Sequence, residues 1–187
     1  QIVEEVIEPM VRVTAEAGAP FVGALYAGLA LTSRGPKVIE FNARFGDPET
    51  QVVLARLTTP LGALLHAAAT GTLDDVGALS WSSEHAVTVV VAAADYPATP
   101  RTGDPITGIE DVDDVPTAYV LHAGTGRADD GTLVSAGGRV LSVVALGDSL
   151  SQARSRVYEA VERIALEGSH HRSDIALAAE RNELHVG

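Results

Sequence analysis

Glu40 and Asn42 are the polar residues whose types and spacing most clearly permit chemistry. Residues 38–41 have the apolar and β-branched character of a strand, and side chains two apart on a strand point to the same face. Glu40 and Asn42 should therefore project together, while Phe41 faces the opposite way into a core. A carboxylate and an amide oxygen are hard ligands suited to Mg²⁺ or Mn²⁺, and Mg²⁺ completes its octahedron with water and nucleotide phosphates. We interpret the pair as a candidate metal- and nucleotide-binding site.

The loop after this strand adds a cation and two more carboxylates. Arg44 is a planar cation that can hold a phosphate or a carboxylate through two parallel hydrogen bonds. Gly46, Asp47 and Pro48 indicate a turn, and Asp47 and Glu49 bring carboxylates near the proposed metal. The same spacing is also typical of a solvated loop at the end of a strand, so the residues by themselves leave both interpretations open.

Lys37, the only lysine of the chain, is predicted to lie away from this site. Side chains alternate along a strand, which places Lys37 and Ile39 on one face and Glu40 and Asn42 on the other. ATP phosphates are normally held by cationic groups as well as by a metal. A lysine that holds such phosphates would therefore have to come from outside this sequence.

Composition limits the class of protein. The 187 residues are 46% hydrophobic, which is enough for one large domain or two small ones. The net charge of −12 argues against a nucleic-acid partner, and the lack of cysteine excludes disulfides and thiolate metal sites. Since no signal peptide or apolar run of membrane-spanning length is evident, we expect a cytoplasmic protein with no membrane partner.

The first part of the chain is predicted to position the candidate site on a hairpin. Apolar residues recur at helical spacing up to Gly18, and Pro9 should kink this helix or start a new one. A turn at residues 33–36 should join two strands as a hairpin. Two helices should follow, with a domain boundary near residue 80. The expected elements are a helix at 1–18, strands at 20–32 and 37–42, and helices at 52–57 and 61–69.

The second part is predicted to be rich in strands. Residues 85–92 form a nearly continuous apolar run, as expected of a strand covered on both faces. The acidic residues 110–114 are most simply a solvated loop, although they could bind a cation weakly. Ser149 should cap a helix, with Gln152 as its capping-box partner and Gly168 at its end. Further strands are expected at 118–122 and 139–146, with a short one from residue 106.

Three histidines outside the loop are interpreted as structural or surface residues. His66 lies among leucines and alanines and is expected to be packed or half-exposed. His170 and His171 are followed by Arg172 and Asp174, but adjacent histidines point in different directions and no third ligand has useful spacing. We favour a surface cluster over a metal site.

Residues 44–51, Arg-Phe-Gly-Asp-Pro-Glu-Thr-Gln, resemble the signature of the glycinamide ribonucleotide synthetase (phosphoribosylamine–glycine ligase) family of ATP-grasp enzymes. The likeness extends over nearly the whole chain. Arg101 and His122 lie in matching segments, which makes them candidates for substrate contact, although roles in turns explain them nearly as well. The matching segments outside residues 44–51 are residues 19–23, 25–29, 96–97, 101–104, 122–125 and 137–141.

This resemblance implies an α+β fold with two domains. Residues 1–79 would be the C-terminal part of an ATP-grasp domain, and residues 80–187 a small strand-rich domain of the barrel-sandwich or single-hybrid type. In the family, the phosphates and adenine of the nucleotide are held by an earlier lobe, and the phosphoribosylamine site is shared with an N-terminal domain. We therefore expect the chain to be the C-terminal part of a longer enzyme, inactive without the N-terminal lobes.

The implied reaction is ATP-dependent ligation of glycine to 5-phosphoribosylamine, which gives glycinamide ribonucleotide, ADP and phosphate through a glycyl phosphate. By this resemblance, Glu40 and Asn42 would hold Mg²⁺ on the nucleotide phosphates, and Arg44 would stabilise the transferring phosphoryl group or the acyl phosphate. The substrate pocket would be shaped by Gly46, Asp47, Pro48 and Glu49, with a carboxylate facing the glycine ammonium. Arg44, Asp47 and Glu49 are the expected catalytic residues.

The sequence departs from the wider superfamily in one feature, and it leaves two alternative assignments of the chain open. Many ATP-grasp enzymes place another acidic metal ligand on the preceding strand, whereas residues 20–32 contain no carboxylate. The chain could belong to another ATP-grasp carboxylate–amine ligase. It could also be a non-catalytic fragment or one module of a split enzyme. Exposed apolar surface on residues 1–32 would instead support a truncated enzyme.

Overall fold

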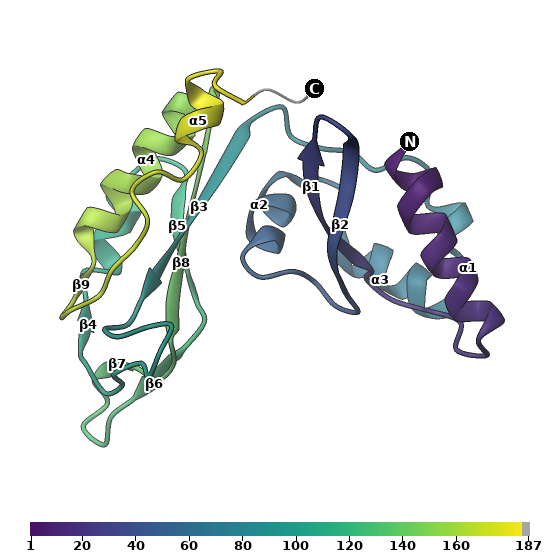
Figure 1. Cartoon of the computed structure of the whole chain (residues 1–187). Helices are drawn as coiled ribbons and strands as arrows, with labels where there is room; N and C mark the ends of the chain where they lie inside the picture. Colours follow the sequence, from purple (N-terminus) through teal and green to yellow (C-terminus); the bar gives the residue numbers. More distant parts are fainter. Residues whose placement is uncertain (185–187) are drawn as a thin grey trace. The chain divides into compact units, whose positions relative to one another are not determined.

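A computed structural model of the protein describes residues 1–184, which divide into two compact units (Figure 1). Unit 1 contains residues 1–50 and 57–81, and unit 2 contains residues 51–56 and 82–183. Helices and strands occur in both units, so the fold is α+β, as predicted. Among the described residues, no helix has the length and apolar character needed to cross a membrane.

Unit 1 begins with a π-helical turn, η1 (Val3–Ile7), followed by α1 (Glu8–Glu16). Pro9 lies in the first turn of α1, where its missing amide hydrogen removes no helical bond. The second of the two predicted effects of Pro9, a new helix start, is therefore confirmed. The helix ends before Gly18, which has a φ of +80° that suits a residue without a Cβ atom.

A β-hairpin follows, formed by β1 (Tyr26–Thr32) and β2 (Gly35–Asn42). The strands are antiparallel, with Thr32 opposite Gly35 next to the turn. The predicted hairpin is confirmed, but the prediction of a strand from residue 20 was wrong for residues 20–25. Gly23 explains part of this difference, because its φ of +139° lies outside the range of a normal strand.

Two helices follow the hairpin, α2 (Glu49–Arg56) and α3 (Leu61–Thr70). Most of α2 is assigned to unit 2, and α3 belongs to unit 1. They match the two predicted helical runs and the break between them. His66 is exposed on α3, which excludes the packed position but not the half-exposed one. A short 3₁₀ turn, η2 (Leu73–Asp75), comes after Gly71, which ends α3 in the left-handed conformation.

The core of unit 2 is a three-stranded antiparallel sheet in the order β3-β8-β5. The helix α4 (Leu150–Arg163) packs against β3 and β8 (Figure 1). All three strands were predicted, but β3 is not covered equally on both faces: Val87, Val89 and Val91 are buried and the residues between them are only partly buried. This alternation follows because one face of the antiparallel sheet packs on the core and the other face is less covered. The strands are β3 (His85–Ala92), β5 (Ala118–His122) and β8 (Arg139–Gly147).

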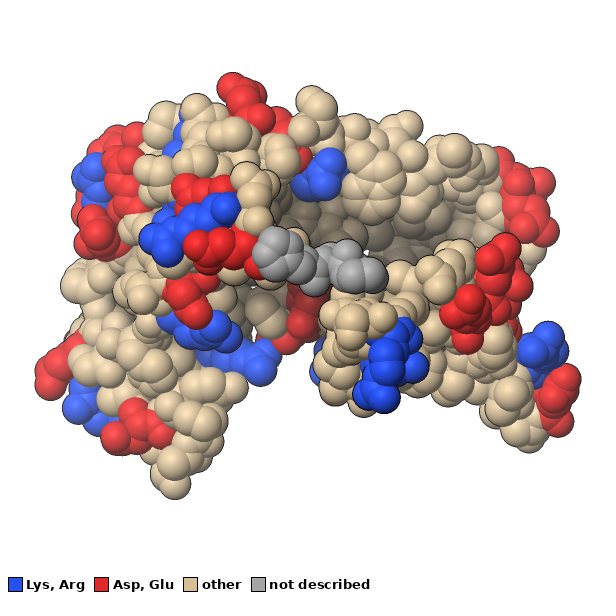
Figure 2. Space-filling model, turned by 45° about the horizontal axis from the view of Figure 1, so that its top comes forward, with Lys and Arg blue, Asp and Glu red and all other residues tan. Residues whose placement is uncertain are grey.

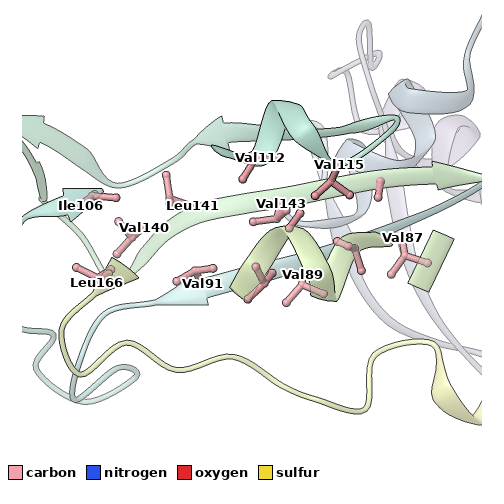
Figure 3. Close-up of a cluster of buried hydrophobic side chains, with 14 of the residues drawn as sticks. Val87, Val89, Val91, Ile106, Val112, Val115, Val140, Leu141, Val143 and Leu166 are labelled. Atoms are coloured by element: carbon pink, nitrogen blue, oxygen red, sulfur yellow. The ribbon is translucent and has the colours of Figure 1, made fainter. Parts of the chain in front are cut away.

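Valine and leucine side chains fill the space between this sheet and the surrounding elements (Figure 3). Val140, Leu141 and Val143 of β8 and Val157 of α4 have no exposed surface. Burial of this kind stabilises a fold by roughly 1.5–3 kcal/mol for each large apolar side chain. Unit 2 therefore has a closed core of its own.

Two predictions for unit 2 were wrong. The acidic residues 110–114 form a 3₁₀ helix, η3 (Glu110–Asp114), because Val112 is completely buried and anchors the segment. Gly168 does not end α4, because the backbone is already extended at Ile164. The smaller elements are β4 (Ile106–Thr107), paired with β9 (Ala165–Leu166), β6 (Thr125–Arg127), paired with β7 (Leu133–Ser135), and α5 (Leu177–Glu180).

The start of α4 forms the predicted cap with one difference. The Ser149 hydroxyl accepts a hydrogen bond from the Gln152 amide at 3.2 Å. The Gln152 side chain reaches back to the amide of Asp148, at 2.8 Å, rather than to that of Ser149. The Ser149 hydroxyl satisfies an amide that the helix start leaves without a helical partner, and the Gln152 side chain holds the residue before the cap.

Candidate functional site

Glu40 and Asn42 lie side by side at the end of β2. The Asn42 side-chain amide donates a hydrogen bond to Glu40 Oε1 at 2.9 Å. The expected projection to one face is therefore present. Glu40 is exposed and Asn42 is half-buried, so the pair is open to a ligand.

The facing strand β1 contributes two residues that sequence reasoning missed, Tyr26 and Gly28. Tyr26 lies opposite Asn42, and Gly28 lies opposite Glu40. A Cβ atom on Gly28 would be 3.1 Å from Glu40 Cγ and 3.6 Å from the Tyr26 ring. Glycine therefore leaves the space in which the Tyr26 and Glu40 side chains come together. The signal in the sequence was the hairpin register, which pairs these residues once the turn is located.

Glu49 is brought to the same face by the tight approach of the loop. A Cβ atom on Gly46, which is buried, would lie 2.5 Å from Glu49 Oε2. The amide of Thr50 donates to the Gly46 carbonyl at 3.3 Å, which holds the first turn of α2 against the loop. A larger residue at position 46 would make the Glu49 carboxylate shift.

Electrostatics join Tyr26 to both carboxylates. Partial burial, the negative charges of Glu49 and Glu40, and a hydrogen bond to Glu49 raise the pKa of the Tyr26 phenol. The phenol therefore remains protonated at neutral pH. Tyr26, Glu40, Asn42 and Glu49 form one polar cluster, which we call the hairpin cluster.

The other predicted site residues lie in the loop beyond the hairpin. Arg44 is exposed, and its Nη1 donates to the Phe45 carbonyl at 2.7 Å. Among the described residues, no hydrogen bond or ion pair joins Arg44 to Glu40, Asn42 or Glu49. Asp47 is exposed and Pro48 is half-buried in the turn before α2. The structure thus brings three of the predicted residues together and leaves Arg44 in the adjacent loop.

The hairpin cluster fits Mg²⁺ through two oxygen ligands. Within residues 1–184, no three His, Asp or Glu side chains are grouped as a metal-binding set. Glu40 and the Asn42 amide oxygen nevertheless form the small, hard donor set that Mg²⁺ takes from a protein when water and phosphates fill its other positions. The donors are adjacent, and Glu40 is exposed while Asn42 is half-buried, which leaves room for those other ligands.

Arg101 and His122 have partners within unit 2. Arg101 Nε is 2.6 Å from Asp104 Oδ2, and its Nη2 donates to the Glu167 carbonyl at 2.8 Å. The hydrogen bond from Arg101 to Asp104 raises the pKa of its guanidinium. The His122 Nδ1 atom lies 3.1 Å from the Thr125 hydroxyl. Both residues thus support turns, as one of their two predicted interpretations stated.

His170 and His171 are exposed, as the surface interpretation predicted. The next residues are held by an ion pair, in which Arg172 donates to both oxygens of Asp174 at 2.9 and 2.7 Å. That pairing with Arg172 lowers the pKa of Asp174.

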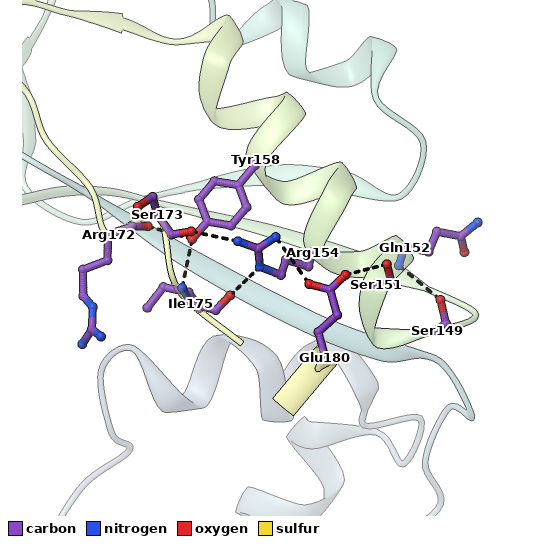
Figure 4. Close-up of polar contacts among 9 residues, drawn as sticks. All are labelled: Ser149, Ser151, Gln152, Arg154, Tyr158, Arg172, Ser173, Ile175 and Glu180. Atoms are coloured by element: carbon purple, nitrogen blue, oxygen red, sulfur yellow. Dashed lines mark hydrogen bonds and ion pairs between the residues drawn. The ribbon is translucent and has the colours of Figure 1, made fainter. Parts of the chain in front are cut away.

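A second polar cluster, centred on Arg154 of α4, was not predicted (Figure 4). Arg154 donates to the carbonyls of Ser173 and Ile175 at 2.8 and 3.0 Å, and it forms an ion pair with Glu180 at 3.4 Å. Its guanidinium also lies 4.9 Å from the centre of the Tyr158 ring. These contacts fasten the segment before and within α5 to α4, so we assign the Arg154 cluster a structural role.

Charge on the surface agrees with the composition. On the face shown in Figure 2, Lys and Arg side chains lie in small groups among Asp and Glu side chains. An extended basic surface of the kind that holds a nucleic-acid backbone is not seen on that face.

Comparisons with known proteins place this site within a family. Residues 1–50 match the model of the ATP-grasp (A) domain of phosphoribosylglycinamide synthetase, and residues 86–178 match the model of its C domain. The phosphoribosylamine–glycine ligase of Streptomyces coelicolor is 64% identical over 181 residues, and that of Mycobacterium leprae is 54% identical over 186 residues. The alignments cover 96% and 100% of this chain, which spans 43% of the length of each relative.

Solved structures agree with the sequence relatives. The crystal structure of phosphoribosylamine–glycine ligase from Thermotoga maritima matches with a TM-score of 0.77 and 31% identity, over 92% of this chain and 41% of that chain. N5-carboxyaminoimidazole ribonucleotide synthetase from the same organism matches with a TM-score of 0.55 and 15% identity, over 87% of this chain and 42% of that chain, which shows a shared fold. From its motif, its fold and these matches, the chain belongs to the phosphoribosylglycinamide synthetase (phosphoribosylamine–glycine ligase) family of ATP-grasp proteins.

Proposed function

We propose that this chain carries the metal-binding and substrate-loop part of a phosphoribosylamine–glycine ligase. The reaction joins glycine to 5-phosphoribosylamine with ATP as co-substrate and gives glycinamide ribonucleotide, ADP and phosphate. The observation that carries this proposal is the hairpin cluster, because its Glu40–Asn42 pair lies within the residues that match the ATP-grasp model.

The residues of the site have distinct proposed roles. Glu40 and Asn42 hold Mg²⁺ or Mn²⁺, which when bound neutralises charge on the nucleotide phosphates. Arg44 is exposed and has donors available for the phosphoryl group or the acyl phosphate of glycine. Asp47 and Glu49 supply negative charge toward the amine groups of the substrates, and Gly46 and Pro48 shape the loop that carries them.

Residues 1–79 are proposed as the C-terminal part of the ATP-grasp domain and residues 80–187 as the C-terminal domain of a cytoplasmic synthetase. Val3, Val13 and Val22 are 58%, 55% and 68% exposed, and these residues lie within the stretch where we expected apolar surface in a partial enzyme. We propose that the remaining lobes of the ligase cover this surface and supply the phosphate-binding cations. The two domains by themselves would then lack ligase activity.

The test is ADP release by the complete ligase that contains these residues. ADP should form only when glycine and 5-phosphoribosylamine are both present, and glycinamide ribonucleotide should appear in equal amount. ADP release that depends on a different acid and amine would indicate another ATP-grasp ligase. A complete protein that binds no nucleotide and releases no ADP would instead support a non-catalytic module.

A further inference from the structure

The hairpin contains a β-bulge beside Glu40. Glu40 lies opposite Gly28 on β1, whereas Val38 lies opposite Leu29, the very next residue of that strand. β2 therefore has one extra residue at this point, Ile39, whose side chain is 71% exposed. One extra residue moves every residue of β2 on the turn side of the bulge to the other face of the hairpin, relative to unbroken alternation.

This bulge brings Lys37, the only lysine of the chain, to the face that carries Glu40 and Asn42. Lys37 lies opposite Ala30, and Glu40 lies opposite Gly28. Directly opposite residues of an antiparallel pair share a face, and so do residues two apart on β1. The prediction that Lys37 and Glu40 lie on opposite faces was therefore wrong, because it assumed unbroken alternation along β2.

The residue types on the two faces of the hairpin agree with this register. On the face away from the candidate site, Leu29 lies opposite Val38 and Leu31 lies opposite Pro36. Unbroken alternation would instead place Lys37 among these apolar side chains. The bulge thus separates an apolar face from a face that carries the charged and polar groups.

The Lys37 side chain is long enough to reach a ligand held by the Glu40–Asn42 pair. Its position on β2 is two β1 residues away from that of Glu40, which is roughly 7 Å at the usual rise of a strand. Lysine has a flexible four-carbon stem, and the small Ala30 lies opposite it. Lys37 is exposed, and within residues 1–184 no hydrogen bond or ion pair involves its ammonium. An accessible ammonium of this kind binds phosphate oxygens as a point charge.

We propose that Lys37 is a phosphate-binding residue, whose ammonium holds an oxygen of the β- or γ-phosphate of the nucleotide. These are the phosphates that a metal at Glu40 and Asn42 would contact, and they carry the charge that must be neutralised during phosphoryl transfer. This inference rests on the proposed ligase function. It adds to that function a cation from this chain, beside those supplied by the remaining lobes.

The register is tested without enzyme activity, by pairs of cysteine substitutions in the complete ligase, since this chain itself contains no cysteine. Ala30→Cys with Lys37→Cys should form a disulfide under mild oxidation, because the Cα atoms of directly opposite residues are about 4.5–5.5 Å apart. Ala30→Cys with Val38→Cys is the matched control, since these residues would be opposite each other only without the bulge. Free thiols are counted in the denatured proteins. Absence of the first disulfide, or equally ready formation of the second, overturns the proposal.

The role is tested by equilibrium binding of nucleotides to the complete ligase in the presence of Mg²⁺. Lys37→Met should weaken the binding of ATP about tenfold or more, as expected for the loss of a hydrogen bond between charged groups, and should leave the binding of AMP within about twofold. Lys37→Arg keeps the charge and should bind ATP within about threefold of the wild type. Arg34→Met is the matched control, because it removes another exposed positive charge from the same hairpin and should leave ATP binding unchanged.

The outcomes separate this inference from the proposed function. Unchanged ATP binding in Lys37→Met, with an active wild-type ligase, would overturn the role of Lys37 and leave the proposed function standing. An equal loss of ATP binding in Arg34→Met would mean that net charge and not a contact is responsible, which also overturns the role. A wild-type ligase that binds no ATP would overturn the proposed function and this role together.

Discussion

The two units differ in how far their apolar side chains are buried. In unit 2, Val140 and Val143 are completely buried within one continuous core. In unit 1, Ile39 is 71% exposed on β2 and Leu31 is 55% exposed on β1, and the buried residues are few. Exposed apolar side chains grouped on one unit are typical of a surface that contacts another protein segment. The comparison indicates that unit 2 is stabilised from within, whereas unit 1 leaves much of its apolar surface exposed.

The same difference appears in the polar groups of the two units. Arg154 in unit 2 is bonded to two backbone carbonyls and one carboxylate, whereas the exposed Arg44 in unit 1 is bonded to the carbonyl of its neighbour. The first arrangement fastens a segment, and the second leaves a cation accessible to a ligand. The proposed functional residues thus occur in the unit that stabilises itself least, as is common for ligand-binding regions.

The largest expected effect comes from separating the units. A fragment of residues 82–183 should fold by itself, because the core of unit 2 lies within it. A fragment of residues 1–81 should lack a cooperative transition and should bind a hydrophobic dye. Circular dichroism during thermal unfolding of both fragments would check this. Cooperative unfolding of the 1–81 fragment at a similar temperature would remove the difference between the units.

Matched leucine substitutions give the next largest difference. Leu141→Ala in β8 should lower the free energy of unfolding by about 2–5 kcal/mol, because it leaves a cavity at a fully buried position. Leu31→Ala in β1 should change it by no more than about 0.5 kcal/mol, since that side chain is 55% exposed. Urea unfolding followed by circular dichroism would measure both values. Equal losses would mean that Leu31 is buried in solution.

A helix cap provides a smaller test within unit 2. Ser149→Ala should destabilise α4 by about 1 kcal/mol, because an amide in its first turn loses the hydroxyl acceptor. Ser149→Asp is the matched control, since a carboxylate can accept the same hydrogen bond, and its stability should remain near that of the wild type. In unit 1, α1 and α3 have no side-chain cap hydrogen bond, so this kind of loss is specific to α4 among the three helices. A loss of equal size in Ser149→Asp would argue against a capping role.

The smallest expected effect concerns pH. The pKa of Asp174 is lowered chiefly by its hydrogen bonds from Arg172. A lowered carboxyl pKa means that this pair stabilises the fold above the ordinary carboxyl pKa and loses that contribution as pH falls through the lowered value. Arg172→Ala should raise the pKa of Asp174 toward its ordinary value, as NMR titration of the carboxyl carbon would show. Both side chains are exposed, so overall stability near neutral pH should hardly change.

Much of the fold was predictable because its signals are local. The hairpin turn, the apolar runs of β3 and β8, and the Ser149 cap are each encoded within a few residues. The predicted strand at residues 20–25 and the predicted helix end at Gly168 were wrong, because positive-φ glycine and extended backbone at Ile164 depend on surroundings that spacing does not reveal.

Only part of the candidate site was predictable from local sequence patterns. The adjacency of Glu40 and Asn42 follows from strand alternation, and the family motif draws attention to the loop. The part played by Tyr26 and Gly28 could not be read in the same way, since it requires the register of β1 against β2. The approach of the Glu49 carboxylate to Gly46 depends on how the loop folds back, which no local pattern specifies.

The most direct test of the account is the Mg²⁺ dependence of ADP release by the complete ligase carrying Glu40→Ala. Loss of one of two proposed metal ligands should lower activity about a hundredfold or more at low Mg²⁺, with partial recovery as Mg²⁺ rises. Val38→Ala, an exposed change two residues earlier on the same strand, should leave the dependence unchanged. Near-normal activity of Glu40→Ala across the whole Mg²⁺ titration would contradict the assignment of Glu40 and Asn42 to the metal.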